Sequence, residues 1–411
     1  MESSYDLVII GGGIGGGALA EIIAKAGQSV LVLEKTTVYP DRVRGEWFAP
    51  WGVIEAKKLG LYDALLAEGG HHLGRHISFG DDIEPDEAIA KALDMTALMP
   101  GVPGPLCIRH PVACELLTTR ATVAGATVLR GVTHTQVSLG PNPAVTYVLD
   151  GEEHVARCRL IVGADGRAGT TREQAGIELH RDPAHHFFTG MLVEGAEGWP
   201  EDVQTKGTEG DVNFLAFPQG NGRVRLYLGY ALDQKSRLSG QDAQRRFLDA
   251  FRLGSVPWSD AIVNSTPISP CPSYPNNDTW TDEPYVSGLV LIGDAAGHND
   301  PIIGQGLSIT FRDVRLVSEI LQANTTWTAA IFAPYGEERG ERMRRLRFAA
   351  TVQSIFDSEF GPGTMERRRR VRLAREADPS LSLATLAVMA GPEMCPPDAF
   401  SDAMKEKLLS L

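Results

Sequence analysis

Three glycines near the start of the sequence, Gly11, Gly13 and Gly16, have the G-x-G-x-x-G spacing of a phosphate-binding turn. In such a turn the first glycine permits a tight bend, the second lets a pyrophosphate approach the backbone, and the third lets a helix lie close to the preceding strand. The free N–H groups at the start of that helix attract phosphate oxygens. Glu34 ends the next apolar run, where a carboxylate can accept hydrogen bonds from ribose hydroxyls, and Lys35 follows it. We predict that these five residues bind a dinucleotide.

Two further acidic residues follow apolar runs later in the chain. Asp165 lies in Gly-Ala-Asp-Gly, and Asp294 lies in Gly-Asp-Ala-Ala, which leads to a helix that begins near Gly306. Open α/β sheets bind ligands at the carboxyl ends of their strands, so both carboxylates are candidates for one site. Arg42 and Arg44 could neutralise a pyrophosphate, and a solvated loop is the alternative for this basic pair.

The elements that must position these groups alternate between strands and helices. Strands are predicted at 7–10, 30–33, 159–162 and 286–292, and helices at 18–26, 52–59, 62–68, 111–123 and 306–321. The short, uniformly apolar strands are typical of a buried parallel sheet. A small antiparallel meander is predicted for 127–137, 145–149 and 154–158, with Asp150-Gly151 as a hairpin turn.

Residues 180–280 have a different pattern. Strand-like runs at 190–193, 212–217 and 224–230 carry aromatic residues and alternate with Gly, Pro and Asn turns, and a helix is predicted at 241–251. Gly220-Asn221-Gly222 is predicted to be the turn of a hairpin. These features indicate a mostly antiparallel sheet in a separate lobe, which we expect residues 76–103 to join.

The C-terminal part is predicted to be helical. Residues 334–375 are rich in arginine with interspersed glutamate, which favours a solvated helical face; binding of a phosphate group of a pyridine nucleotide is the alternative. A short apolar helix is predicted at 382–390.

Length, charge and composition argue against several kinds of partner and site. The chain has 411 residues, enough for a large core and two or three domains. Its net charge of −13 argues against a nucleic-acid partner. The five cysteines are scattered without a C-x-x-C pair, which argues against a disulfide framework and a zinc site and favours the cytoplasm. No run of about 18 uncharged apolar residues predicts a membrane span, and an early first strand leaves no room for a signal peptide.

The motifs occur together and in order, and with them the chain resembles the FAD-dependent monooxygenases of the para-hydroxybenzoate hydroxylase-like family, the single-component aromatic hydroxylases. The stretch GADGRAGTTR is similar to the family's Asp-Gly motif at Asp165, Gly166 and Arg172. The stretch LIGDAAGHNDPIIGQGLSITFRD is similar to its Gly-Asp motif at Gly293, Asp294, Pro301, Gly304, Gly306 and Asp313. Arg109 falls where the family has an arginine at the head of a helix, and DRVRGE resembles a stretch of squalene epoxidase.

Two departures from the family pattern leave alternatives open. Asp294 is followed by Ala-Ala-Gly-His where the hydroxylases usually have Ala-Ala-His, and Ser308 stands where asparagine is common. This form is seen in flavin-dependent halogenases and in geranylgeranyl reductases. The halogenase motif W-x-W-x-I-P and its lysine are missing, and the reductase motif reduces to Phe217-Pro218. A flavin-dependent halogenase and a flavin reductase or dehydrogenase therefore remain the alternatives.

The resemblance implies that FAD is the cofactor and that it lies extended across the first domain. By this resemblance its ADP end contacts the glycine motif, Glu34 and Lys35, and the remaining contacts come from Arg44, Arg109, Asp165, Asp294 and the turn from Gly304 through Gly306 to Leu307. NADPH or NADH would bind transiently, because no second glycine-motif unit follows. The implied reaction with O2 runs through a flavin C4a-hydroperoxide that hydroxylates an aromatic or other electron-rich small molecule.

The substrate site is expected between the flavin and the 180–280 sheet. Its candidate residues are Trp47, Asn213, Phe217 and Tyr227, and a place in the core is the alternative for each. His298 is the best candidate for a base or orienting donor. By the resemblance Pro301 packs against the flavin face, and His298 and Pro301 are the predicted catalytic residues.

The predicted fold class is α/β, or α+β overall. A Rossmann-like FAD-binding domain is expected to be discontinuous (1–75, 104–179 and 281–333), with a mainly antiparallel substrate domain (76–103 and 180–280) and a C-terminal helical region (334–411). We expect a monomer or homodimer that binds a small aromatic or hydrophobic substrate and no nucleic acid.

Overall fold

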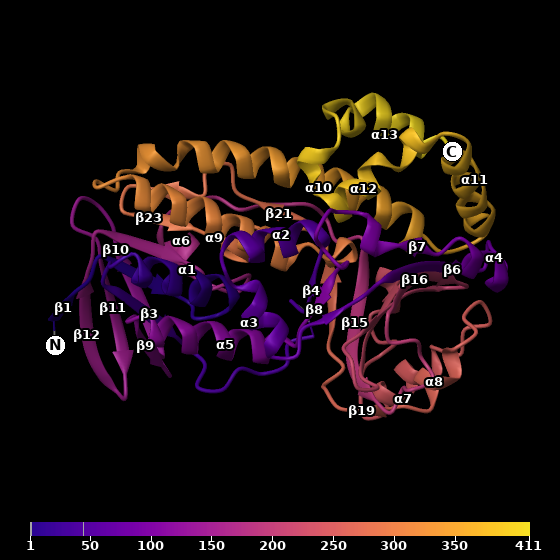
Figure 1. The fold of residues 1–411 in the computed structure, drawn as a ribbon, viewed down its shortest axis with the longest axis horizontal. Coiled ribbons are helices and arrows are strands. Elements are labelled where there is room, and N and C mark those ends of the chain that lie inside the picture. Colours follow the sequence, from indigo (N-terminus) through magenta and orange to yellow (C-terminus); the bar gives the residue numbers. More distant parts are fainter. Residues whose placement is uncertain (1, 44) are drawn as a thin grey trace.

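A six-stranded sheet forms the centre of one half of the molecule (Figure 1). The structure, a computed structural model, describes residues 2–43 and 45–411. The sheet order is β22-β23-β13-β2-β3-β9, and its neighbours pair in parallel except β22, which is antiparallel to β23. The strands are β2 (Leu7–Ile10), β3 (Val30–Glu34), β9 (Thr127–Arg130), β13 (Leu160–Gly163), β22 (Tyr285–Val286) and β23 (Leu289–Leu291).

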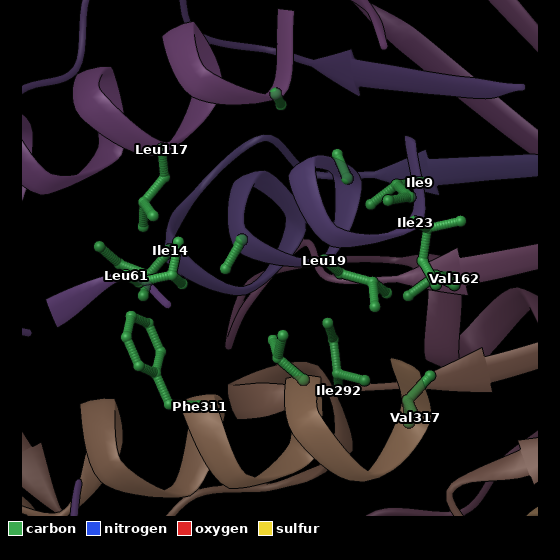
Figure 2. Packing of buried hydrophobic residues seen from close by; sticks show 14 of the residues in the cluster. Ile9, Ile14, Leu19, Ile23, Leu61, Leu117, Val162, Ile292, Phe311 and Val317 are labelled. Carbon is green, nitrogen blue, oxygen red and sulfur yellow. The ribbon is translucent and has the colours of Figure 1, made fainter. Parts of the chain in front are cut away.

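Helices cover this sheet closely. Helix α1 (Ile14–Lys25) lies between α5 (His110–Val123) and α9 (Gly306–Ala323), and Figure 2 shows Leu19 and Ile23 of α1 among the packed side chains. A Cβ at Gly17 would lie 3.0 Å from the Cβ of Leu117, so a small residue lets α1 approach α5. Burial of each large aliphatic side chain in this layer stabilises the fold by about 1.5–3 kcal/mol.

The first strand predicted for the meander, 127–137, is divided in two, and only its second part joins the meander, as β10. Residues 127–130 form β9, which pairs in parallel with β3 in the central sheet. The reason is local, because Gly131, with a φ of +81°, ends the strand and turns the chain away. The remaining strands form a sheet in the order β1-β12-β11-β10, with bounds Glu2–Ser4, Glu152–Arg157, Ala144–Leu149 and His134–Ser138. Asp150 and Gly151 have φ values of +53° and +83°, as the predicted hairpin turn requires.

A second, larger sheet lies beside the first. Its order is β19-β15-β18-β17-β16-β6-β7, with β20 paired to β15, and its pairs are antiparallel except β6 with β16. The bounds are β6 (Arg75–Gly80), β7 (Leu93–Asp94), β15 (His186–Glu194), β16 (Val203–Glu209), β17 (Val212–Pro218), β18 (Val224–Tyr230), β19 (Thr266–Pro267) and β20 (Ser273–Asn276). One face packs against α7 (Ala243–Asp249) and α8 (Ser259–Val263) around a core that includes Phe214 and Phe251. The other face is turned toward the C-terminal helices.

The C-terminal helices begin beside α9 and extend to the end of the larger sheet, where the last of them are drawn in yellow in Figure 1. They are α10 (Ala333–Ser358), α11 (Thr364–Ala377), α12 (Leu383–Ala390) and α13 (Asp402–Leu409). The predicted solvated arginine face is wrong for Arg339 and Arg342, which are both buried. Both pair with the buried Asp313 of α9, and Arg339 also donates to carbonyls of the Gly-Asp motif. A periodic charge pattern could not reveal this, because the partners lie on other elements.

Shorter elements complete the described chain. They are α2 (Pro50–Lys58), α3 (Tyr62–Ala67), α4 (Pro85–Ala90), α6 (Thr171–Gln174), β4 (Trp47–Phe48), β5 (His71–His72), β8 (Leu106–Cys107), β14 (His180–Arg181) and β21 (Thr279–Trp280). None of the helices in residues 2–43 and 45–411 combines the length and apolar character needed to cross a bilayer. The predicted fold class, a parallel sheet with a mainly antiparallel second sheet and C-terminal helices, is confirmed. The domain boundaries stay a prediction.

Candidate active site

One cavity of about 1600 Å³ joins both sheets and the C-terminal helices. Pockets for a single small ligand measure about 300–1,000 Å³, so this cavity has room for more than one ligand. Its lining includes most of the predicted site residues: Gly11, Gly13, Glu34, Lys35, Trp47, Asp165, Phe217, Tyr227, Asp294, His298, Pro301, Gly304, Gly306 and Leu307. The fold thus brings together residues that are up to about three hundred positions apart in the sequence.

The start of α1 forms one end of the cavity. Gly11 has a φ of +102°, and a Cβ there would lie 2.4 Å from the carbonyl oxygen of Ala164. A Cβ at Gly16 would lie 1.8 Å from the Gly11 carbonyl oxygen, so Gly16 serves helix packing and does not itself line the cavity. A Cβ at Gly13 would meet open space, and no side chain caps α1. The first N–H groups of the helix therefore face a space that suits a phosphate.

Glu34 lies buried at the end of β3 beside the glycine turn. Its Oε2 accepts a hydrogen bond from the Gly12 N–H at 2.6 Å, and its Oε1 accepts one from the Thr36 N–H at 2.7 Å. Tyr39 donates its hydroxyl proton to the Gly12 carbonyl at 2.6 Å. The Thr36 hydroxyl also donates to Oε1. A carboxylate oxygen can accept two hydrogen bonds, so Glu34 fixes the turn while its Oε2 keeps acceptor capacity for a ligand.

The basic residues predicted for the site do not all lie on the cavity. Arg44 lies outside the described residues, while Arg42 lines the cavity. Arg109 is the residue before α5 and does not line the cavity, although its Nε is buried without a hydrogen-bond partner in the described chain. Arg172 donates to the Ile177 carbonyl at 2.9 Å and so holds the loop after α6.

Arg225 of β18, which the sequence analysis missed, binds Asp41 and Glu46, two acids that precede β4. The Arg225 guanidinium lies 2.7 Å from Asp41 Oδ2 and also pairs with the buried Glu46. Burial raises the pKa of Glu46, and the charge of Arg225 opposes that rise. The available signal was an arginine within an otherwise apolar strand, together with two acids in a short loop.

A second uncapped helix start lies further along the cavity. Gly304 is left-handed, with a φ of +64°, and a Cβ there would lie 3.1 Å from Cε3 of Trp47. Helix α9 begins directly afterwards without a side-chain cap, and Gly306 and Leu307 in its first turn line the cavity. The positive end of this helix suits the negatively charged edge of a ligand.

Two carboxylates flank this region. Asp294 Oδ2 accepts a hydrogen bond from Arg167 Nε at 2.8 Å. Asp165 Oδ2 accepts from the Thr171 N–H at 3.0 Å and hydroxyl at 2.7 Å, while its Oδ1 is buried without a partner in the described chain. Burial raises the pKa of Asp165. An orphaned acceptor beside a cavity calls for a donor on a ligand.

The larger sheet supplies an aromatic wall. The ring centres of Trp47 and Phe217 are 6.0 Å apart, and those of Phe217 and Tyr227 are 6.1 Å apart. Burial holds the pKa of Tyr227 well above its usual value, so its phenol is neutral. Asn213 does not belong to this wall, because its buried amide donates to the Gly207 carbonyl at 2.9 Å and links β17 to β16.

A directional chain of hydrogen bonds lines the same wall and was also missed. Trp47 Nε1 donates to Gln204 Oε1 at 2.8 Å, and Gln204 Nε2 lies 3.2 Å from His76 Nδ1. His76 Nε2 then lies 3.1 Å from the Ser78 hydroxyl. Enclosure by the protein lowers the pKa of His76 to about 3, so its imidazole is neutral at pH 7. These residues come from strands that pair only after folding, so no local motif marks them.

His298 and Pro301 both line the cavity. His298 Nδ1 is 2.8 Å from the Thr279 hydroxyl, which also accepts from the His298 N–H at 3.0 Å. Pro301 follows the buried Asp300, whose Oδ1 accepts from the Ile302 N–H at 2.9 Å. Burial raises the pKa of Asp300 to about 7. Both predicted catalytic residues therefore lie in a polar framework that fixes their backbone.

Residues 4–353 match the family model described as FAD binding domain. The chain belongs to the FAD-binding-domain family. The predicted recognition of an FAD-dependent monooxygenase of this superfamily is confirmed, and the protein is a flavoenzyme with FAD as its cofactor.

Two curated relatives show the range of this superfamily. Menaquinone reductase from Mycobacterium tuberculosis is 26% identical over 400 residues, covering 91% of this chain and 90% of that protein. Squalene epoxidase from Aspergillus fumigatus is 28% identical over 355 residues, covering 77% of this chain and 66% of that protein.

Solved structures share the fold. The p-nitrophenol 4-monooxygenase from Pseudomonas putida aligns with a TM-score of 0.78 and 17% identity, covering 100% of this chain and 98% of that chain. A flavin-dependent brominase aligns with a TM-score of 0.76 and 18% identity over the whole of both chains.

The residues of this flavoenzyme fit an extended FAD. A phosphate-compatible helix start at Gly13 and an anion-compatible helix start at Gly306 open into one cavity, with the orphaned Asp165 oxygen on the same lining. The bound cofactor would have its pyrophosphate toward α1 and its ring toward α9, as the motif order implies. The role of each individual residue toward FAD stays a prediction.

Proposed function

We propose that the protein is an FAD-dependent monooxygenase that uses NAD(P)H and O2 to hydroxylate an aromatic or other electron-rich small molecule. One observation carries the proposal: the cavity that holds the cofactor motifs continues into a chamber with an aromatic wall formed by Trp47, Phe217 and Tyr227. A flat, electron-rich substrate fits such a wall because aromatic rings pack favourably against one another.

Residues in different parts of the cavity would have different roles. The glycine turn and Glu34 would bind the adenosine end of FAD, and the start of α9 would stabilise negative charge on the ring. Bound FAD supplies the redox chemistry, namely hydride acceptance and the activation of O2. The protein must position the substrate and keep water away, which the apolar side chains of Leu215, Ile302 and Ile303 on the cavity lining favour.

Pro301 and His298 would act beside the substrate. Pro301 offers a rigid, apolar surface next to the ring-binding turn, and the His298 imidazole is oriented by Thr279. In this proposal His298 accepts or relays the proton of a substrate hydroxyl, while the Trp47–Gln204–His76 chain holds the opposite wall in place. The support for both roles is their position on the cavity lining.

A reductase without oxygen insertion is the second candidate. Menaquinone reductase is 26% identical over 91% of this chain, and the absence of the halogenase motif W-x-W-x-I-P and its lysine favours a reductase over a halogenase. The two candidates differ in the product, because a hydroxylase adds one oxygen atom and a reductase adds hydrogen. We further propose that the protein acts in the cytoplasm as a monomer or homodimer; the free thiols of its five cysteines are consistent with a reducing setting.

Product mass tests the function directly. The FAD-loaded protein is mixed with NADPH or NADH, O2 and a panel of phenolic, indolic and quinolone-like compounds, with a quinone added for the reductase. We expect substrate-dependent NAD(P)H oxidation and a product that contains one additional oxygen, which is labelled when ¹⁸O2 is used.

The controls separate the alternatives. NAD(P)H oxidation that yields only hydrogen peroxide, or a product that gains hydrogen alone, contradicts the hydroxylase. Bromide or chloride in the buffer detects a halogenase through halogen incorporation. His298→Gln is expected to reduce kcat while the protein still binds FAD, and an unchanged pH profile of kcat would remove His298 from the proton transfer.

A further inference from the structure

Past the aromatic wall, the same cavity is lined by β6 and β16 of the larger sheet and by helices α10 to α12. We call this part of the cavity the distal chamber. Its apolar lining consists of Phe79, Leu93, Leu98, Phe356, Leu386 and Val388, and two arginines of α11, Arg368 and Arg375, also line it. Figure 1 shows α11, α4 and β6 close together at this end of the molecule.

Arg375 has no hydrogen-bond partner in the described chain. Its Nε is buried and unpartnered, and its guanidinium lies 5.3 Å from the ring centre of Phe356. The acid that interacts with it electrostatically, Asp357, forms an ion pair with Lys206 at 3.0 Å. Burial lowers the pKa of Arg375, and the charge of Asp357 only partly opposes this effect.

Arg368 has open donors as well. Only 9% of its surface is exposed, and its Nη2 donates to Asp81 Oδ1 at 2.8 Å. Its Nε and Nη1 are buried and have no partner in the described chain. Arg368 and Arg375 are seven residues apart, so they lie on the same face of α11 about two turns apart, and both have unused N–H groups beside the cavity that they line.

The acids around the chamber are already paired. Arg372 pairs with Asp82 at 3.2 Å, and Lys91 pairs with Glu87 and Glu376, each at 2.7 Å. With Asp81 on Arg368 and Asp357 on Lys206, Arg375 has no ion pair of its own in the described chain, although the acidic and basic residues of this cluster balance in number. An unpaired guanidinium away from water is unfavourable unless a ligand supplies the counter-charge.

We propose that the distal chamber is a subsite for an anionic group of the substrate, namely a carboxylate, a sulfonate or a phosphate. The inference rests on the proposed function and specifies its substrate class: a molecule with an electron-rich ring at the flavin and an anion at the arginines, joined by an apolar spacer. The anion accepts hydrogen bonds from Arg375 and Arg368, and the apolar lining receives the spacer.

Helix α10 connects the predicted flavin face with the surroundings of Arg375. Gln353 donates to the Ile302 carbonyl at 3.1 Å, next to Pro301 at the predicted flavin face. Asp357, beside the arginine pair, lies one turn later on the same helix, which corresponds to about 6 Å along its axis. The ring and the anion of the substrate are therefore separated by several bonds.

The same chemistry could come from a phosphate of the pyridine nucleotide. The continuity of the distal chamber with the aromatic wall favours the substrate, and the acids Asp82, Asp357 and Glu376 on its lining disfavour a nucleotide with several phosphates. The experiment below separates these two sources.

Matched acids and amides provide the test. The FAD-loaded enzyme is titrated by calorimetry with a series of ω-(4-hydroxyphenyl)alkanoic acids of increasing chain length and with their primary amides. We expect one chain length at which the acid binds at least about tenfold more tightly than its amide, and we expect Arg375→Gln to remove most of that preference. Arg375→Lys keeps the charge and is expected to retain part of it.

Arg369→Gln is the control, since Arg369 lies on the same helix but is 59% exposed. It should leave the preference for the acid unchanged. Far-ultraviolet circular dichroism and FAD content verify that each variant is folded.

Three results would overturn the inference. The first is equal binding of acids and amides at every chain length, and the second is a preference for the acid that survives Arg375→Gln. The third is a higher KM for NADPH in Arg375→Gln with unchanged acid binding, which would assign the arginines to the pyridine nucleotide. Because the readout is binding, a failure of the enzyme to insert oxygen would refute the proposed function without altering this result.

Discussion

Two pairs of arginines on neighbouring helices have opposite surroundings. On α10, Arg339 and Arg342 share the buried carboxylate of Asp313, and Arg339 satisfies three backbone carbonyls of the Gly-Asp motif. On α11, Arg368 and Arg375 retain donors without partners.

The difference distinguishes arginines that support the fold from arginines that are available to bind a ligand. A fully paired buried arginine organises the backbone around it, as Arg339 does for the loop that carries Asp294. An arginine with unused donors beside a cavity contributes little to the fold and is available to a ligand. Mutations should therefore affect the two pairs in different ways.

The largest effect is expected at the paired site. Arg339→Met removes three hydrogen bonds to carbonyls and one partner of Asp313, and breaking a buried ion pair of this kind costs about 3–5 kcal/mol. Denaturant unfolding should show this loss together with weaker FAD binding. Arg344→Met on the same helix, where the side chain is 45% exposed and pairs with Glu341, should cost less than about 1 kcal/mol. Equal losses at the two positions would remove the distinction.

A buried carboxyl group, unlike a buried arginine, can lose its charge by binding a proton. Asp300 is fully buried near Asp278, His186 and Arg167, and burial raises its pKa to about 7. Its folded pKa lies above the unfolded value, so the folded state holds one more proton between the two pKa values and stability falls as the pH rises toward 7. From pH 5 to pH 8 this amounts to about 2–3 kcal/mol.

Asp300→Asn should remove that part of the pH dependence. The amide can still accept the hydrogen bond from the Ile302 N–H, so the variant should be more stable than the natural protein at pH 8 and similar to it at pH 5. Unfolding curves at both pH values measure the difference. Parallel pH profiles for the two proteins would mean that Asp300 is ionised in the fold.

The smallest effect is expected at the unpaired site. Arg375→Met removes a charge without a partner, so the free energy of unfolding should stay within about 1 kcal/mol and should rise rather than fall. Chemical denaturation without added ligand is the measurement, with Arg369→Met as the matched control. A loss as large as that of Arg339→Met would show that Arg375 supports the fold.

Local patterns predicted the two strands of the first βαβ unit well, while the helix begins at Ile14, four residues earlier than predicted. Strand β2 has the predicted bounds, and β3 differs by one residue, because short apolar runs bounded by glycine turns determine these strands locally. The glycine positions at Gly11 and Gly304 also followed from the motifs, since each needs a left-handed or sterically open backbone.

The sequence patterns could not predict contacts between residues that are far apart in the chain. Nothing near Arg339 in the chain indicates that it contacts the loop of Asp294, and nothing near Gln204 indicates that it accepts from Trp47. Strand β9 was assigned to the wrong sheet because its apolar pattern is equally compatible with a meander and with a parallel edge. The distal chamber combines residues from β6, β16 and α10 to α12, so only the fold reveals it.

The order of strands in the central sheet has a consequence for synthesis on the ribosome. Strand β13 lies between β2 and β23, and β23 ends at Leu291, so one side of β13 stays unpaired until more than two thirds of the chain has emerged. Pairings of such long sequence separation form slowly and leave an apolar strand edge exposed in the meantime. Newly made chains should therefore depend on chaperones until residues 289–291 leave the exit tunnel, and rapid expression should favour aggregates of nascent chains that lack β23.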